Sequence, residues 1–264
     1  MGKIIAICAQ KGGSLKSAIS LSVSSVLSKQ GKKVLIVDGD PQANLTFSIG
    51  VDFTELEYTL RELMQSIIDF EFESEDTKSV IVKTQYGIDL LPASIYMADL
   101  ELKLITATQR EFIVKKALAS VKDEYDYIFI DCPPTLGLFL VNYLTAADEA
   151  LIPVSCDTLG SIGMGQLIQS INAIQKSTNP DLKICGALFT LYQRTKDANE
   201  VVNAVRNSFG KHITIFETMI PSSTEAKKAV SHRMPINVYN KNCSVTKAYE
   251  NFVNNEFLPK EEGK

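Results

Sequence analysis

Short apolar runs alternate along this chain with longer stretches in which apolar residues recur every three or four positions. The short runs are rich in Val, Ile and Leu, as at 34–37, and a continuous apolar run predicts a strand buried on both faces. We expect strands at 3–9, 33–37, 88–91, 127–131, 149–154, 184–191 and 213–216. We expect helices at 16–29, 56–69, 98–121, 136–145, 163–177, 197–209 and 245–257. This alternation predicts an α/β fold with a doubly wound, mostly parallel sheet flanked by helices.

Composition favours a single compact unit. The 264 residues are 45% hydrophobic, which is enough for a sizeable core. We expect one domain over 1–258, without an N-terminal helix-turn-helix, and a flexible tail over 259–264. The net charge of −4 argues against a dedicated nucleic-acid coat but leaves a local basic patch possible. The five cysteines form no C-x-x-C pair and only two histidines are present, so we expect reduced cytosolic thiols and no zinc site.

The loop after the first predicted strand is the first place to look for chemistry, because ligands of such sheets bind beyond the carboxyl ends of the strands. Residues 10–17 read QKGGSLKS and lead directly into a helix. Backbone N–H groups in such a loop converge on phosphate oxygens, Lys16 would reach the β- and γ-phosphates, and the Ser17 hydroxyl would contact Mg²⁺. The plainer alternative is a glycine-rich turn capped by Ser17.

Two further strands end in carboxylates. Asp40 lies in the segment DGDPQAN at 38–44, where a carboxylate suits Mg²⁺ contact or orientation of a water molecule. Asp131 ends the apolar strand 127–131 and is the candidate that delivers a carboxylate to the metal. The alternatives are an Asp-Pro turn that caps the next helix and a strand that simply ends in an acid.

These segments together resemble the ParA/MinD superfamily. Residues 11–17 are similar to its deviant Walker A motif K-G-G-x-x-K-[ST], 38–44 to D-x-D-P-Q-x-N, and 125–134 to Y-D-x-I-[IL]-I-D-x-P-P. The strand end 152–157 and the spacing from Ile220 to Pro235 also match, so the resemblance covers nearly the whole chain. The D-P-Q sequence favours the partition branch, ParA, over MinD.

The resemblance implies a P-loop ATPase that uses ATP and Mg²⁺, with hydrolysis that is weak alone and stimulated by a partner. The implied catalytic residues are Lys11, which reaches across a dimer, Lys16 and Asp40, which orients the attacking water. The implied metal residues are Ser17, Asp40 and Asp131. The implied nucleotide-binding residues are Lys11, Gly12, Gly13, Ser14, Leu15, Lys16, Ser17, Ala18 and Pro221.

The implied partners are a second copy of the chain in an ATP-dependent homodimer, a ParB-like adaptor protein and non-specific DNA, for plasmid or chromosome partitioning. Clustered Lys and Arg can neutralise phosphates without reading sequence. A solvated basic face is the alternative. The C-terminus does not resemble the membrane-targeting helix of MinD, so the expected location is cytoplasmic and nucleoid-associated, with no membrane. The DNA-binding candidates are Lys227, Lys228, Arg233, Lys241 and Lys247.

Three positions depart from the family pattern. Leu15 stands where the family has glycine, Ser222 where it has arginine, and Lys228 where it has glutamate. Since a leucine resists positive φ, either the loop accepts a negative φ at Leu15 or nucleotide binding is weakened. The alternatives left open are a nucleotide-binding pseudo-ATPase, a MinD-like spatial regulator, an electron-transfer iron protein, and an α/β enzyme for another phosphate compound.

Overall fold

The computed structural model of the chain describes residues 2–261 and 263, without the side chains of 158 and 159. One sheet of eight strands crosses the molecule in the order β3-β4-β2-β5-β1-β6-β7-β8. All neighbouring strands pair in parallel except β3, which is antiparallel to β4. The strands are β1 (Lys3–Ile7), β2 (Val34–Asp38), β3 (Val82–Lys83), β4 (Asp89–Leu91), β5 (Tyr127–Asp131), β6 (Glu149–Ser155), β7 (Lys183–Tyr192) and β8 (Ile215–Pro221).

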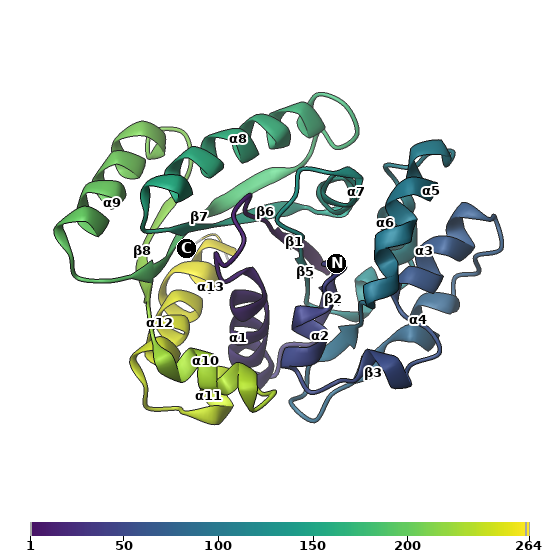
Figure 1. The fold of residues 1–264 in the computed structure, drawn as a ribbon, viewed down its shortest axis with the longest axis horizontal. Coiled ribbons are helices and arrows are strands. Elements are labelled where there is room, and N and C mark those ends of the chain that lie inside the picture. The colour runs from purple at the N-terminus through teal and green to yellow at the C-terminus, as the bar shows by residue number, and fades with distance from the viewer. Residues whose placement is uncertain (1, 262, 264) are drawn as a thin grey trace.

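Helices cover both faces of this sheet (Figure 1). The first half of the chain contributes α1 (Lys16–Lys29), α2 (Asn44–Ser48), α3 (Leu60–Ile68), α4 (Asp76–Val80), α5 (Leu100–Thr106), α6 (Ile113–Ala119) and α7 (Leu138–Ala146). The second half contributes α8 (Thr158–Gln175), α9 (Lys196–Phe209), α10 (Thr224–Ser231), α11 (Ile236–Tyr239), α12 (Ser244–Phe252) and α13 (Leu258–Glu261). The π-helix Val253–Phe257 joins α12 to α13, and short 3₁₀ helices lie at Phe53–Glu55, Ile95–Asp99 and Lys122–Glu124.

The alternation of side chains along β1 separates the two largest hydrophobic cores, and a smaller third cluster lies between α1, α2, β2 and β4. Ile4 and Ala6 face a core that is completed by α3 and α5 to α8. Ile5 and Ile7 face a core that is completed by α1, α11 and α12. The purple α1 and the yellow α12 therefore pack side by side in Figure 1 although they lie far apart in sequence. This arrangement confirms the predicted doubly wound sheet buried on both faces.

The predicted helix over 98–121 is wrong, because the segment divides into α5 and α6. Gln109 between them adopts a positive φ of 53°. The Asn142 side chain of α7 compensates for the break: it donates to the Arg110 carbonyl at 2.7 Å and accepts from the Val114 N–H at 3.3 Å. A buried amide from another element thus satisfies backbone groups that a continuous helix would have paired internally.

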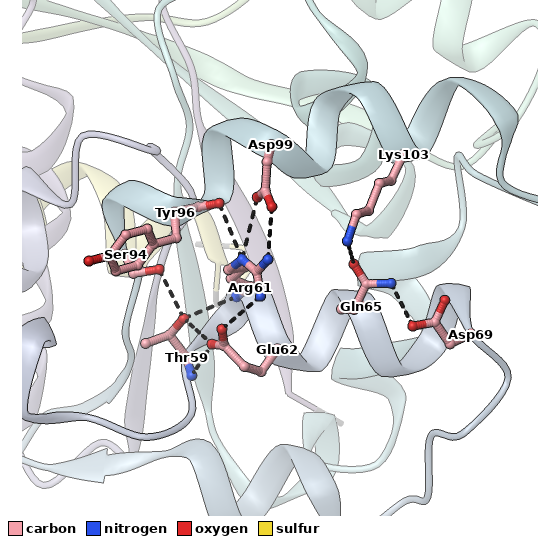
Figure 2. Close-up of polar contacts among 9 residues, drawn as sticks. All are labelled: Thr59, Arg61, Glu62, Gln65, Asp69, Ser94, Tyr96, Asp99 and Lys103. Atoms are coloured by element: carbon pink, nitrogen blue, oxygen red, sulfur yellow. Dashed lines mark hydrogen bonds and ion pairs between the residues drawn. The ribbon is translucent and has the colours of Figure 1, made fainter.

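A polar contact fixes α3 to the segment that leads into α5 (Figure 2). Arg61 lies 2.8 Å from a carboxylate oxygen of Asp99 and 3.1 Å from one of Glu62. The side chains of Thr59 and Glu62 form a capping box at the start of α3. On the next turn, Lys103 donates to the Gln65 amide oxygen at 2.6 Å.

The C-terminal segment is helical through Glu261. Residues 259–261, which we expected to belong to a tail, continue α13, and Glu261 accepts from Lys3 of β1 at 2.5 Å. Residues 262 and 264 lie outside the described part of the chain. Among the helices described here, none combines the length and the apolar character that crossing a bilayer would require.

Candidate nucleotide-binding site

The loop between β1 and α1 leaves open space above its glycines. Gly13 has a φ of 75°, and a Cβ built at Gly12 or Gly13 would meet no protein atom within 4 Å. The residue that precedes α1, Leu15, offers no side-chain acceptor to the first N–H groups of the helix. Because these N–H groups have no partner inside the helix, they and the helix dipole form a binding site for an anion such as phosphate. Ser14 adds a buried hydroxyl that has no hydrogen-bond partner among the described residues.

Leu15 adopts the left-handed conformation that the sequence made doubtful. Its φ is 68° and its ψ is 23°, which excludes the first of the two alternatives, a loop that accepts a negative φ at this position. For a residue with a Cβ this conformation costs roughly 1–2 kcal/mol. The Leu15 side chain packs against the core that contains α1, α11 and α12. Burial of an aliphatic side chain contributes free energy of similar size, which explains how a leucine holds the geometry of a glycine.

Two buried carboxylates lie side by side at the ends of β2 and β5. Asp38 and Asp131 are register partners in these parallel strands and are 0% and 1% exposed. Neither carboxylate oxygen of Asp131 has a hydrogen-bond partner among the described residues. Burial, and then the charge of Asp38, raise the pKa of Asp131 well above its ordinary value, while Ser17 and the charge of Lys16 oppose the rise. A buried, unpartnered carboxylate next to a lysine and a serine hydroxyl fits a divalent cation.

Asp38 is a functional residue that the sequence interpretation missed. Thr46 of α2 donates its N–H and its hydroxyl to Asp38 Oδ2 at 2.8 and 2.7 Å, and the N–H of Asp40 donates to Oδ1 at 3.2 Å. Burial raises the pKa of Asp38, and these donors oppose the rise. Asp38 therefore fixes the segment between β2 and α2 at both of its ends, beside Asp131 on the neighbouring strand. The two acids of the D-G-D sequence could have indicated this role. The pattern alone does not show which of them anchors the segment and which contributes to catalysis.

Gly39 brings this segment into close contact with β5. Its N–H donates to the Asp131 carbonyl at 2.9 Å, and its own carbonyl accepts from the Tyr143 hydroxyl at 2.8 Å. A Cβ at this position would lie 2.7 Å from the Tyr143 ring, so only glycine fits. Asp40 follows, half-buried, and accepts from the Gln42 N–H at 3.0 Å. Its side chain thus forms part of a local turn.

Lys11 is held by its own subunit in this single chain. Its ammonium group lies 2.6 Å from Asp157 Oδ2, at the end of β6. Asp157 also caps α8, since its Oδ1 accepts from the Gly160 N–H at 3.0 Å. Partial burial works against ionisation, yet the contacts with Lys11 and Gly160 lower the pKa of Asp157 below its ordinary value. The structure therefore ties the Lys11 side chain of the loop to the residue that caps α8.

A mostly apolar cavity of about 130 Å³ adjoins the loop. Leu15, Ala18 and Pro221, which the sequence assigned to the nucleotide, all line it. The cavity lies beside the start of α1 and beyond the carboxyl ends of β7 and β8, where Leu191 and Ser222 contribute. The predicted nucleotide-binding residues thus border two adjoining spaces, a polar loop and an apolar cavity.

The basic candidates for DNA binding lie on α10 to α12 and are all exposed. Two of them are engaged in the structure: Lys228 lies 2.8 Å from Glu225, and the Arg233 guanidinium lies 4.2 Å above the Phe47 ring of α2. Lys227, Lys241 and Lys247 project from the same C-terminal elements. Arg233 and Lys241 lie in the turns that connect these helices, and the role of the five in DNA binding stays a prediction.

Comparison with known proteins agrees with this geometry. A family model described as an AAA domain matches residues 2–184. The sporulation initiation inhibitor protein Soj of Bacillus subtilis is 39% identical over 90% of this chain and 92% of its own length. The chromosome-partitioning ATPase Soj of Treponema pallidum is 36% identical over 95% of each chain.

Among solved structures, cobyrinic acid a,c-diamide synthase of Mycobacterium smegmatis, with bound ADP and magnesium, is similar with a TM-score of 0.85 and 33% identity. The match covers 100% of this chain and 97% of that one. The loop after β1, the paired carboxylates of β2 and β5, and these relatives together show that the chain belongs to the ParA/Soj family of partition ATPases.

Proposed function

We propose that this chain binds ATP with Mg²⁺ and hydrolyses it to ADP and phosphate in order to partition DNA. The observation that carries the proposal is the buried, unpartnered carboxylate of Asp131 beside the uncapped N-terminus of α1. Anion-binding N–H groups and a cation-binding carboxylate are what a metal-bound triphosphate requires in one place. The ADP and magnesium bound by the Mycobacterium smegmatis relative support the same ligand class.

Each residue has a separate task in this proposal. The N–H groups of 12–17 and the Lys16 ammonium bind the phosphate oxygens, and Ser17 and Asp131 hold the cation. When bound, Mg²⁺ neutralises charge that develops on the transferred phosphoryl group. Asp40 leaves its turn with Gln42 and orients the attacking water. Positioning and electrostatics supply most of the rate enhancement in phosphoryl transfer.

A second copy of the chain completes the site. Lys11 leaves Asp157 and reaches the phosphates of the partner, because an ammonium group satisfied by one carboxylate is attracted more strongly by several phosphate oxygens. ATP-dependent closure then places the basic residues of α10 to α12 from both copies on one assembly. That assembly binds DNA without reading its sequence. A ParB-like adaptor stimulates hydrolysis and so releases the dimer from DNA. DNA binding in the ATP-bound state places the protein in the cytoplasm on the nucleoid.

The test of this proposal is nucleotide-dependent retention on DNA, measured together with phosphate release. We expect retention with ATP and release with ADP. Asp40→Ala should bind ATP normally, lower turnover by about a hundredfold or more, and remain on DNA. An Asp40→Ala protein that hydrolyses ATP at the wild-type rate would remove Asp40 from the mechanism. Absence of ATP binding by calorimetry at millimolar ligand would overturn the proposal as a whole.

The second candidate is a nucleotide sensor that does not hydrolyse ATP, and Leu15 is the observation that favours it. A non-glycine residue at a φ of 68° makes the loop less adaptable. This candidate predicts an ATP-dependent dimer without adaptor-stimulated phosphate release. Single-turnover hydrolysis, measured with and without adaptor, separates the two.

A further inference from the structure

Leu15 replaces the glycine of the family pattern, and its position in the structure indicates a role in binding the nucleotide rather than a defect. Its backbone takes the conformation of the glycine it replaces, and its side chain is directed into the apolar cavity rather than over Gly12 and Gly13. In the core it packs with the group that includes Ala229, Val245 and Tyr249. The leucine side chain therefore lies away from the open space above Gly12 and Gly13.

The cavity has the chemistry of a site for a flat ring. Ala18 and Leu21 of α1 and Val245 of α12 line it with aliphatic carbon. The polar residues at its border are Ser22, Ser222, Ser223, Tyr249 and Lys227. No carboxylate borders it among the described residues. Such a lining accepts the faces of an aromatic ring and gives few fixed hydrogen bonds to its edge.

We propose that Leu15 is a base-contacting residue: its side chain forms the wall shared by the phosphate loop and the cavity, against which the ring of the nucleotide packs. This rests on the proposed function in one respect, that the phosphates occupy the loop 11–17. The leucine then increases affinity for a nucleotide through the base and leaves affinity for the phosphates unchanged. It follows that glycine at this position weakens ATP binding, although glycine is the residue of the family pattern.

The experiment compares two ligands that share the phosphates and differ in the base. ATP and inorganic tripolyphosphate, each with Mg²⁺, are titrated into the wild type, Leu15→Gly and Leu15→Ala. We expect ATP affinity to fall about tenfold in both variants, because an apolar contact with the ring is lost. We expect tripolyphosphate affinity to stay within about twofold of the wild type. Leu102→Ala removes a leucine of α5 that is 73% exposed, and it should change neither affinity.

Leu15→Ala keeps a Cβ in the strained backbone and so separates loss of the side chain from gain of backbone freedom. Thermal melts of each variant verify the fold. Unchanged or tighter ATP binding in both variants overturns the role of Leu15 and leaves the proposed function standing. A parallel loss of ATP and tripolyphosphate also overturns it, because the leucine would then act on the loop. A wild type that binds neither ligand overturns the proposed function itself.

Discussion

Charged side chains meet in two regions of this molecule, and their partners differ. In the contact between α3 and α5 (Figure 2), Arg61 binds both Asp99 and Glu62. The hydrogen bond from Arg61 lowers the pKa of the Asp99 carboxyl. The Asp99 side chain is 49% exposed, so water also solvates its charge. The charges of Arg61, Asp99 and Glu62 are therefore paired with one another and need no ligand.

The strand-end site is the opposite. Asp131 is buried, has no hydrogen-bond partner among the described residues, and its pKa is raised by burial and by Asp38. An unpaired buried charge costs free energy, and a fold keeps one only where something else compensates. The difference teaches that the direction of a pKa shift, together with the missing partner, separates an acid that stabilises the fold from one that binds a ligand.

The largest effect that would sharpen this contrast is the loss of Lys16. Lys16→Ala should weaken ATP binding by at least about thirtyfold, because truncating one partner of a buried charge pair, here the lysine and the phosphates, costs roughly 2–5 kcal/mol. Isothermal titration calorimetry with Mg²⁺ and ATP measures it. Lys103→Ala, which removes a lysine that donates to Gln65 in Figure 2, is the matched control and should bind ATP normally. Equal ATP affinity in the two variants would erase the distinction between the regions.

The second effect is the change in Tm when an aspartate is replaced by asparagine, which should be opposite in sign in the two regions. Asp131→Asn should raise the Tm of the ligand-free protein, since a buried unpaired carboxylate becomes a neutral amide. For a chain of this length, each kcal/mol shifts Tm by about 2–4 °C. Asp99→Asn should lower Tm slightly. With Mg²⁺ and ATP, the wild type and Asp99→Asn should gain stability by ligand linkage, and Asp131→Asn should gain little.

The pH dependence of these variants follows from the same shifts. The pKa of Asp131 is higher in the folded than in the unfolded state, so its contribution to stability is present at low pH and is lost as the pH rises through the folded value. The advantage of Asp131→Asn over the wild type should therefore grow from acid toward neutral pH in urea titrations. Asp99 has a lowered pKa and contributes stability that is lost as the pH falls. An advantage of Asp131→Asn that shrinks as the pH rises would contradict the assignment.

The elements that the sequence predicted well are those in which local pattern and tertiary burial agree. The bounds of α1 and β5 are as predicted, because each is bordered by a clear signal: a glycine-rich loop before α1 and an acid and two prolines at the end of β5. The sheet follows from the same apolar runs. The helix predicted over 98–121 failed because its interruption depends on Asn142, which is distant in sequence.

The site shows the same limit. Lys16, Ser17 and Asp131 could be named from sequence because a loop, a helix and a strand place them in order. The anchoring role of Asp38 could not, since it depends on two donors from Thr46, which only the folded chain brings within reach. The spacing of residues in a motif identifies functional residues in the loops that follow strands. Contacts between residues distant in sequence determine that Asp38 anchors the segment, and they leave Asp40 as the acid available for catalysis.

The smallest predicted effect tests whether the site is restrained before it meets its partner copy. Asp157→Asn keeps a side chain that caps α8, because asparagine and aspartate are equivalent N-caps, but it removes the charge that holds Lys11. The Lys11 and Asp157 side chains are 37% and 44% exposed, so their ion pair stabilises the paired position of Lys11 by at most about 1 kcal/mol of free energy. Because each dimer gives up two such pairs, at roughly 0.5 kcal/mol each, the ATP-dependent dimer should form at protein concentrations about fivefold lower, by sedimentation with a non-hydrolysable analogue. Asp157→Ala frees Lys11 equally and also loses the cap, so it should match the asparagine variant in dimerisation and melt earlier. A weaker dimer in Asp157→Asn would mean that Asp157 guides Lys11 toward the partner rather than restraining it.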